Sequence, residues 1–379
     1  MDSSLILIAI VVAVALAFDF TNGFHDTANA MATTIATKAL PPRLAVALAA
    51  VLNFVGAFIS LKVAATIAEG LVSSSAISLE VVFAALVGAI AWNLVTWYLG
   101  LPSSSSHALI GGTVGATLLA AGLSAVSWSG LVSKVVLPAI VAPLLAAAIA
   151  AALTFLAYRL LVRRDRHQRA MGGFWWAQIA SSSLVALSHG TNDAQKTMGI
   201  ITLALVVNGN LPTSGFEVPT WVIVAAASAI GLGTYAGGWR IIRTLGHRVT
   251  DIEPPQGFSA ETASAGIIFA SSALGYPLST THVVSGSVAG SGLGRFGRLR
   301  SVRWGVALQI VVAWVLTLPG AAIFAALAIA GIGALGSDVA GTLSIGVGTA
   351  IVATILFWAS RRSPVTPDNV NAAAVRTTS

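Results

Sequence analysis

The chain contains no cysteine and very little charge. Of its 379 residues, 9% are Asp, Glu, Lys or Arg, whereas 56% are hydrophobic. A soluble globular domain carries about 25% charged residues, so this composition indicates an all-α polytopic membrane protein in a lipid bilayer. Without cysteine, disulfides and thiolate metal sites are excluded. The first apolar segment also lacks a basic region and a cleavage pattern, so we expect it to be retained.

The basic residues are few and lie in short clusters between apolar segments. The net charge of +7 could suggest nucleic acid, but such clusters are typical of membrane topology signals. We therefore expect no nucleic-acid partner. Sixteen of the 20 Lys and Arg residues fall in turns that share one side if two Pro-containing segments are re-entrant tips: 38–43, 159–169, 240–248, 295–303 and 361–362. Treating the four hairpin arms as full spans keeps these turns on the same side, so the charge pattern alone does not establish re-entry. With either arrangement it predicts an external N-terminus and a cytoplasmic C-terminus in the plasma membrane.

The apolar segments repeat in order along the chain. About 20 residues span a bilayer, so residues 3–37 are too long for one simple helix, and we expect a break near Gly23. The first half continues with a membrane span at 44–61 and a helical arm at 81–100. A Gly-rich arm then runs up to 121, and a second span covers 135–158. The second half repeats this order at 173–207, 219–238, 258–275, up to 294, and 304–330, before a last span at 341–360.

Each half has three net crossings besides its hairpin, and an odd number inverts the second half in the membrane. The predicted fold is therefore two inverted-topology repeats with broken helices and two re-entrant helical hairpins, with a site near the midplane. The expected domains are the N-terminal repeat, the C-terminal repeat, an additional transmembrane helix and a disordered cytoplasmic tail, at 1–169, 170–335, 336–362 and 363–379.

Two polar signatures, 19–29 and 188–196, interrupt the long apolar segments. With Gly23 set on Gly190, Asp26 falls on Asp193 and Asn29 on Lys196. A carboxylate cannot bind a bare anion in a low dielectric, so we expect Asp26 and Asp193 to carry a proton or to bind Na⁺ or a substrate-borne divalent metal. Neutral oxygens that suit hard cations, and further polar groups of the signatures, are supplied by Asn22, Asn29, Asn192, His25, Thr21, Ser188 and Lys196. The alternative is a structural bond between Asp193 and Lys196, one helical turn apart.

The two hairpin tips, 101–107 and 276–282, each combine Pro, a Ser/Thr run and His. Pro102 and Pro277 end the incoming arm, and the residues that follow occupy the first turn of the next helix. There, free N–H groups and hydroxyls favour an oxyanion. The predicted anion ligands are Ser103, Ser104, Ser105, Ser106, Ser279, Thr280 and Thr281. The alternative is that they only cap their own helices.

Four of the six histidines lie in the four repeated motifs: His25, His107, His189 and His282. His107 and His282 follow the Ser/Thr runs, where they could donate to an anion, titrate, or bond a backbone carbonyl. Asp19 and Glu261 are weaker candidates. We expect Glu261 to lie in a hairpin arm near the cytoplasmic interface, where a solvated or ion-paired position is as consistent with the sequence as a role in the site.

At these motifs the sequence resembles the inorganic phosphate transporter (PiT) family. The resemblance rests on Asn22-Gly-Phe-His-Asp-Thr-Ala-Asn29, on His189-Gly-Thr-Asn-Asp193 and on both Pro-Ser/Thr-His tips. It implies a secondary carrier, usually a dimer, in which the hairpin hydroxyls hold inorganic phosphate and the signature Asp and Asn residues bind the coupling cation. It implies no cofactor.

One residue departs from the sodium-coupled pattern of that family. Those members typically have Gly-Ala-Asn-Asp in the first motif, whereas this chain has Gly23-Phe-His25-Asp26. In this it resembles bacterial low-affinity members, which are proton-coupled and take phosphate with Mg²⁺ or another divalent metal. Asn192-Asp193 keeps sodium coupling open, and the tips do not distinguish phosphate from sulfate.

We therefore predict a symporter that imports inorganic phosphate, and not an enzyme. An anion channel is a rival, but a channel would not need buried carboxylates beside an anion. A membrane enzyme is a second rival. However, the Ser runs lack a Gly-x-Ser-x-Gly nucleophile elbow, and each motif occurs twice, which suits binding better than catalysis.

Overall fold

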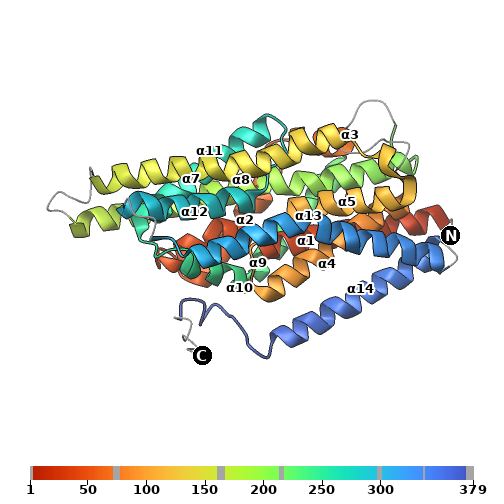
Figure 1. The fold of residues 1–379 in the computed structure, drawn as a ribbon. Coiled ribbons are helices and arrows are strands. Elements are labelled where there is room, and N and C mark those ends of the chain that lie inside the picture. Colours follow the sequence, from red (N-terminus) through yellow and green to blue (C-terminus); the bar gives the residue numbers. More distant parts are fainter. Residues whose placement is uncertain are drawn as a thin grey trace.

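The computed structural model describes residues 3–70, 77–159, 167–212, 217–296, 301–335 and 338–372, and within them the chain is helical. The only strand-like pairing there is an isolated bridge between Thr250 and Val302. The main helices are α1 Ser3–Ala36, α2 Pro42–Gly56, α3 Lys62–Gly70, α4 Leu79–Leu99, α5 Ser105–Ala121, α7 Leu137–Ala157, α8 His167–Val207, α9 Thr220–Ala236, α10 Trp239–Arg243, α11 Pro254–Ala273, α12 Thr280–Phe296, α13 Trp304–Ala334 and α14 Asp338–Ser360 (Figure 1).

Several helices have the length and composition of membrane spans. Among the described residues, five helical segments are long and apolar enough to cross a bilayer, and the bent pair of α9 with Trp239–Arg248 makes a sixth. In these segments many large apolar side chains face outward, such as Leu144, Val315 and Ile355. Outward-facing apolar side chains are expected where lipid, rather than water, surrounds the protein.

The two signature-bearing helices are continuous, which corrects the prediction of broken helices. α1 runs through its signature for 34 residues and α8 for 41 residues. Glycine gives these helices close contact with a neighbour rather than a break. A Cβ atom on Gly23 would lie 2.2 Å from the carbonyl oxygen of Ile230 on α9, and one on Gly190 would lie 2.1 Å from that of Asn53 on α2. Small residues permit this approach of backbones in membrane helices.

The hairpin arms match the predicted segments closely. α4 and α5 pack against each other, as do α11 and α12. The last helix of each predicted half packs on the hairpin of the other half: α7 lies along α12, and α13 lies along α5. The two halves are therefore interleaved, and α1 and α8 lie side by side within them.

The C-terminal segment corrects another prediction. Residues 363–372 are not free of the fold, because the Val370 side chain is fully buried and the Arg243 guanidinium donates to the Asn369 backbone and side-chain oxygens at 2.5 and 2.8 Å. His247 also pairs with Asn371 at 2.9 Å. The expectation of disorder does not hold for this part of the tail, while 373–379 lie outside the described residues.

Candidate functional site

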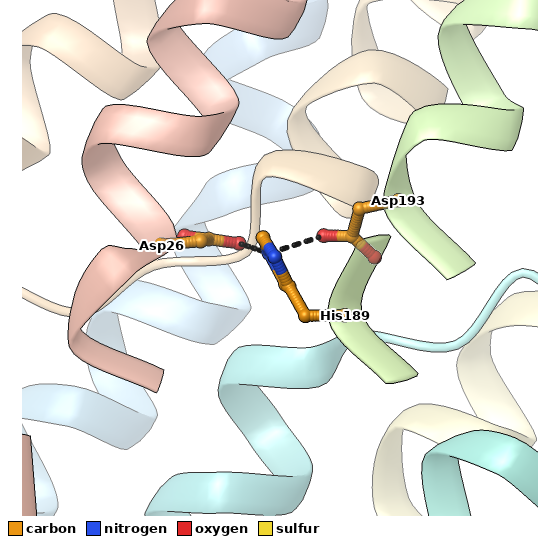
Figure 2. Close-up of side chains that lie close together, drawn as sticks. All are labelled: Asp26, His189 and Asp193. Carbon is orange, nitrogen blue, oxygen red and sulfur yellow. Dashed lines mark ion pairs between the residues drawn. The ribbon is translucent and has the colours of Figure 1, made fainter. Parts of the chain in front are cut away.

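The two signatures meet in the interior of the helix bundle. Asp26 on α1 and Asp193 on α8 are buried, and the His189 ring lies between their carboxylates (Figure 2). Its Nε2 atom is 3.2 Å from Asp193 Oδ2 and 3.9 Å from Asp26 Oδ2. Two segments 167 residues apart in the repeat alignment thus form one cluster, as the matched motifs predicted.

The hairpin tips point at the same cluster. α5 and α12 begin immediately after the Pro-containing turns, and their N-terminal hydroxyls cap them: Ser104 Oγ accepts from the His107 amide at 3.1 Å, and Ser279 Oγ accepts from the His282 amide at 3.3 Å. Ser104 and Ser279 therefore cap their own helices, and their role as anion ligands stays a prediction. The hydroxyls that follow each capping residue do not cap the helix and contact the signatures instead.

The first-turn hydroxyls contact the signatures in a pairwise repeated pattern. Ser105 donates to Asp26 at 3.4 Å, and Thr280 donates to Asp193 at 3.3 Å. One residue later, Ser106 accepts from Lys196 at 2.6 Å, and Thr281 accepts from Asn29 at 3.0 Å. Each tip therefore bonds one carboxylate and one donor, and all of these groups are buried.

Lys196 supplies a fixed positive charge. Its ammonium lies 2.5 Å from Asp193 Oδ1, so the predicted bond one helical turn apart is present. It also donates to the backbone oxygen of Leu278 in the second tip at 3.1 Å. Because all three ammonium hydrogens have acceptors, burial of the charge is offset by a complete set of bonds.

His25 connects the first carboxylate to the first hairpin. Its Nδ1 atom is 2.6 Å from Asp26 Oδ1, and its Nε2 atom is 3.2 Å from the Thr96 hydroxyl of α4. Thr96 bonds Ser103 at 2.7 Å. Ser103 is therefore held beside the first signature and is not among the first-turn hydroxyls that contact Asp26, Asp193, Lys196 and Asn29. A proton on His25 would interact directly with Asp26.

His189 was not among the predicted coupling residues. It falls on Asn22 in the repeat alignment, and this mismatch hid its position between the carboxylates. Its other ring nitrogen, Nδ1, pairs with Asn53 on α2 at 3.1 Å, which orients the ring. The presence of histidine in each of the four motifs was the signal that could have identified it.

The predicted amide residues are buried but differ in their contacts. Asn192 donates to Ser272 at 2.8 Å and to the Tyr276 backbone oxygen at 3.4 Å, so it holds the second hairpin. Asn22 lies one turn before Asp26. The Oδ1 atoms of Asn22, Asn29 and Asn192 have no hydrogen-bond partner within the described ranges.

Two predicted supporting residues lie away from the cluster. Thr21 donates to the Phe18 carbonyl and lines a cavity of ≈ 870 Å³ between α1, α4 and α14. Ser188 is buried and donates to the Val185 carbonyl of its own helix at 2.9 Å. Both hydroxyls therefore satisfy local backbone acceptors.

The two tip histidines form a pair of their own. The His107 and His282 ring centroids are 4.6 Å apart, and His282 stacks on Trp314 of α13 at 4.0 Å. His282 Nδ1 also lies 3.2 Å from the Ala139 backbone oxygen on α7. The backbone-carbonyl alternative is thus present for His282. The histidine pair joins the two hairpins, and His282 also contacts α7 and α13.

For Glu261 the solvated or ion-paired alternative is wrong among the residues that the structure describes. Glu261 is 3% exposed, and its donors are neutral side chains. Ser181 donates at 2.6 Å, Thr34 at 2.8 Å and Gln178 at 3.3 Å, together with a short bond from Thr33. These donors come from α1 and α8, so the cluster ties both helices to α11.

The central cluster has a donor set that fits a cation. Ligand atoms of Asp26, His189 and Asp193 lie within 4.8 Å of one another, and all three residues are buried. Two carboxylates and an imidazole suit a divalent metal of intermediate softness, and the carboxylates and amides alone suit hard cations. Lys196 already pairs with the carboxylate of Asp193, so the Asp26 carboxylate supplies the net negative charge that a cation would balance.

The comparisons with known proteins match this arrangement. The model of the phosphate transporter family matches residues 22–177 and again residues 162–325, one match for each half of the chain. The chain belongs to the phosphate transporter family. The resemblance expected from the motifs is therefore confirmed. Family members are transporters, so the prediction that this chain is not an enzyme is also confirmed.

Named relatives cover nearly the whole chain. A probable low-affinity inorganic phosphate transporter of Mycobacterium bovis is 55% identical over 98% of this chain and 88% of its own length. A probable low-affinity inorganic phosphate transporter of Bacillus subtilis is 47% identical over 86% of this chain and 98% of its own length. A solved structure, the sodium-dependent phosphate transporter, has a TM-score of 0.71 and 26% identity, covering 85% of this chain and 97% of that one.

Proposed function

We propose that this protein is a secondary active symporter that imports inorganic phosphate, held between the N-terminal ends of α5 and α12. The observation that carries the proposal is the repeated contact pattern of Ser105 with Asp26 and Thr280 with Asp193. Two helix N-termini with hydroxyls in their first turns converge on one buried cluster, and such ends favour an anion. The names of the relatives and of the family agree with phosphate as that anion.

The carboxylates explain why transport would be coupled. Phosphate beside Asp26 and Asp193 would be strongly repelled in a low dielectric. Protons, or a divalent metal carried with phosphate, would remove that repulsion, and the Lys196 ammonium beside Asp193 supplies a further positive charge. The loaded site would then be close to neutral, and a neutral site crosses a membrane at lower electrostatic cost.

Sodium coupling is the alternative for the coupling ion. The related solved structure is named as sodium-dependent, and the unpaired Oδ1 atoms of Asn29 and Asn192 are suitable sodium ligands. Sulfate is the alternative substrate, since the first-turn hydroxyls suit any tetrahedral oxyanion. The two choices are independent and are tested by separate arms of one assay.

We further propose that residues 1–169 and 170–335 are inverted repeats, with α4–α5 and α11–α12 as re-entrant hairpins. The matched contacts of α1 with α9 and of α8 with α2, and of each hairpin with the last helix of the other half, support a twofold relation. We place the protein in the plasma membrane as a homodimer, with the N-terminus outside and the C-terminus in the cytoplasm.

Phosphate uptake into proteoliposomes tests the function. Purified protein is reconstituted, and uptake of labelled phosphate is measured while pH gradient, Na⁺ and Mg²⁺ are varied one at a time, with unlabelled sulfate as competitor. We expect saturable uptake that an inward proton gradient and Mg²⁺ stimulate. Absence of saturable phosphate flux under every condition would refute the proposal.

Matched variants locate the site within that assay. Ser105→Ala and Thr280→Val each remove one tip hydroxyl, and we expect each to weaken apparent phosphate affinity. Thr113→Val removes a hydroxyl of the same helix α5 that bonds its own backbone at Leu109. This control should behave as wild type. Equal effects of all three changes would place phosphate elsewhere.

A further inference from the structure

Asp19 stands apart from the other buried carboxyls of the described chain. Its side chain is fully buried on α1, seven residues before Asp26. Asp26, Asp193 and Glu261 each bond several donors, whereas neither oxygen of Asp19 has a hydrogen-bond partner in the described ranges. Asp26 and Asp193 thus lie beside histidine or lysine groups that can balance a negative charge, Glu261 has neutral donors, and Asp19 has neither.

A buried carboxylate without a donor is very unfavourable as an ion, so such a group takes up a proton. Thr197 on α8 interacts with Asp19, and the Thr197 hydroxyl is also without a hydrogen-bond partner in the described ranges. A protonated Asp19 is a donor and Thr197 Oγ1 an acceptor, so one proton suits both groups. Loss of that proton would leave a buried negative charge that no donor of the described residues bonds in this structure.

The charged groups that act most strongly on Asp19 belong to the central cluster. They are Asp193, His189 and Lys196, all on α8. Other helices packed against α1 carry titratable side chains near their ends: Glu80 and Tyr98 on α4, and Tyr235 on α9. The protonation of Asp19 is therefore coupled mainly to the charge of the second signature.

The second half has no counterpart of this carboxyl. In the repeat alignment Asp19 falls on Ala186, and Thr197 falls on Ala30. Both alanines are buried in the apolar interior. The proposed anion site is thus built from matching residues of both halves, whereas the carboxyl of Asp19 occurs only in the first half.

We propose that Asp19 is the proton-binding group of transport, carrying one proton with the loaded site and releasing it to water when the site opens. This inference rests on the proposed function and specifies its coupling ion. Binding adds one proton and removes one negative charge from the region beside Asp193, His189 and Lys196, and release restores that charge. Asp26 and Asp193 stay ionised throughout, held by the cations and hydroxyls around them.

Infrared difference spectroscopy tests the protonation directly on the purified full-length protein. We expect the carbonyl band of a protonated carboxyl at neutral pH in the wild type, its loss in Asp19→Asn and a shift in its frequency in Asp19→Glu. Glu80→Gln, which removes a partly exposed carboxyl from the start of α4, should leave the band unchanged. A wild-type spectrum without the band overturns the inference without any variant.

Proteoliposomes test the coupling. In the wild type, an inward proton gradient should raise phosphate uptake, and uptake should acidify the lumen. In Asp19→Asn, uptake with and without the gradient should become equal and the acidification should disappear, with recovery in Asp19→Glu. A gradient response retained in Asp19→Asn, or a strict sodium requirement with no proton movement, overturns the inference. A wild type that moves no phosphate instead refutes the proposed function, and the spectra still decide the protonation of Asp19.

Discussion

The two signature segments share one geometry and differ in charge. Asp26 and Asp193 each accept from the first-turn hydroxyl of one hairpin, and each lies in a helix that touches a neighbouring backbone through glycine. Yet the position after one helical turn is Asn29 in the first segment and Lys196 in the second. The first carboxylate is thus surrounded by histidine and amide groups, and the second carries its own cation.

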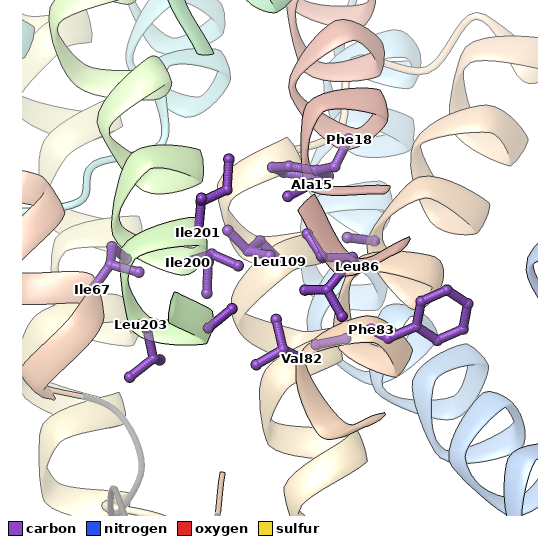
Figure 3. Close-up of a cluster of buried hydrophobic side chains, with 14 of the residues drawn as sticks. Ala15, Phe18, Ile67, Val82, Phe83, Leu86, Leu109, Ile200, Ile201 and Leu203 are labelled. Atoms are coloured by element: carbon purple, nitrogen blue, oxygen red, sulfur yellow. The ribbon is translucent and has the colours of Figure 1, made fainter. Parts of the chain in front are cut away.

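The polar groups of the two signatures thus occupy matching positions, but their charges differ. A second contrast concerns Glu261. With Pro102 of the first hairpin set on Pro277 of the second, Glu261 falls on Leu86. In the signature alignment its donors Thr33 and Thr34 fall on Ile200 and Ile201. Figure 3 shows the three apolar counterparts in one buried cluster, where the other half has a carboxylate network. Matching backbones thus carry a polar core on one side and an apolar core on the other.

The largest expected effect separates the two carboxylates. Asp193→Asn leaves the buried Lys196 without its ion partner, and breaking such a pair costs about 3–5 kcal/mol of stability. Asp26→Asn removes hydrogen bonds from groups that can remain neutral, at about 1–2 kcal/mol. Thermal unfolding in detergent measures both. Asp193→Asn combined with Lys196→Met should regain much of the loss, and equal destabilisation by the two single changes would contradict the contrast.

The next effect concerns phosphate affinity. Lys196→Met removes a charged donor from Ser106, and bonds to charged groups contribute about 1.5–3 kcal/mol, which corresponds to roughly 10- to 100-fold in affinity. Asn29→Ala removes a neutral donor from Thr281 and should weaken binding by no more than about tenfold. The concentration dependence of uptake gives both values. A larger loss of phosphate affinity in Asn29→Ala than in Lys196→Met would show that the charged donor of the second signature is not the more important one.

Glycine substitutions should affect both halves alike. Gly23→Ala and Gly190→Ala each place a Cβ atom against a rigid backbone carbonyl, so we expect about 1–3 kcal/mol of destabilisation from each. Gly173→Ala on α8 is the control, because nothing lies within 4 Å of its added carbon. Unfolding temperatures compare the three. A neutral result at only one signature would show that the two helix contacts are not equivalent.

The smallest effect tests the one-sided network around Glu261. Glu261→Gln keeps the shape of the side chain but replaces one acceptor oxygen by an NH₂ donor. That donor would face a hydroxyl that also donates, so we expect a loss of about 1 kcal/mol in the free energy of unfolding. Ser182→Ala serves as the control, because that hydroxyl bonds only its own helix at Ile179. The same unfolding assay applies. Stabilisation by Glu261→Gln would indicate that the carboxyl is strained rather than satisfied.

The sequence alone determined the class of molecule, the order of its helices and the four motifs of the site. Apolar length and charge clustering act locally along the chain, so the hairpin arms and the N-terminal positions of Ser104 and Ser279 could be predicted residue by residue. Repetition within one chain then paired Asp26 with Asp193 without any structure. The family followed from the same motifs.

Only the tertiary structure decided which polar groups meet. Gly23 and the residues around it suggest a break when considered along the chain, but packing against α9 keeps α1 continuous and uses the glycine for contact. His189 between the two carboxylates, the neutral donors of Glu261 and the unpaired Asp19 likewise depend on residues of other helices. Hydrogen bonds between distant segments leave no local pattern in a sequence, and these bonds determine which buried groups carry charge.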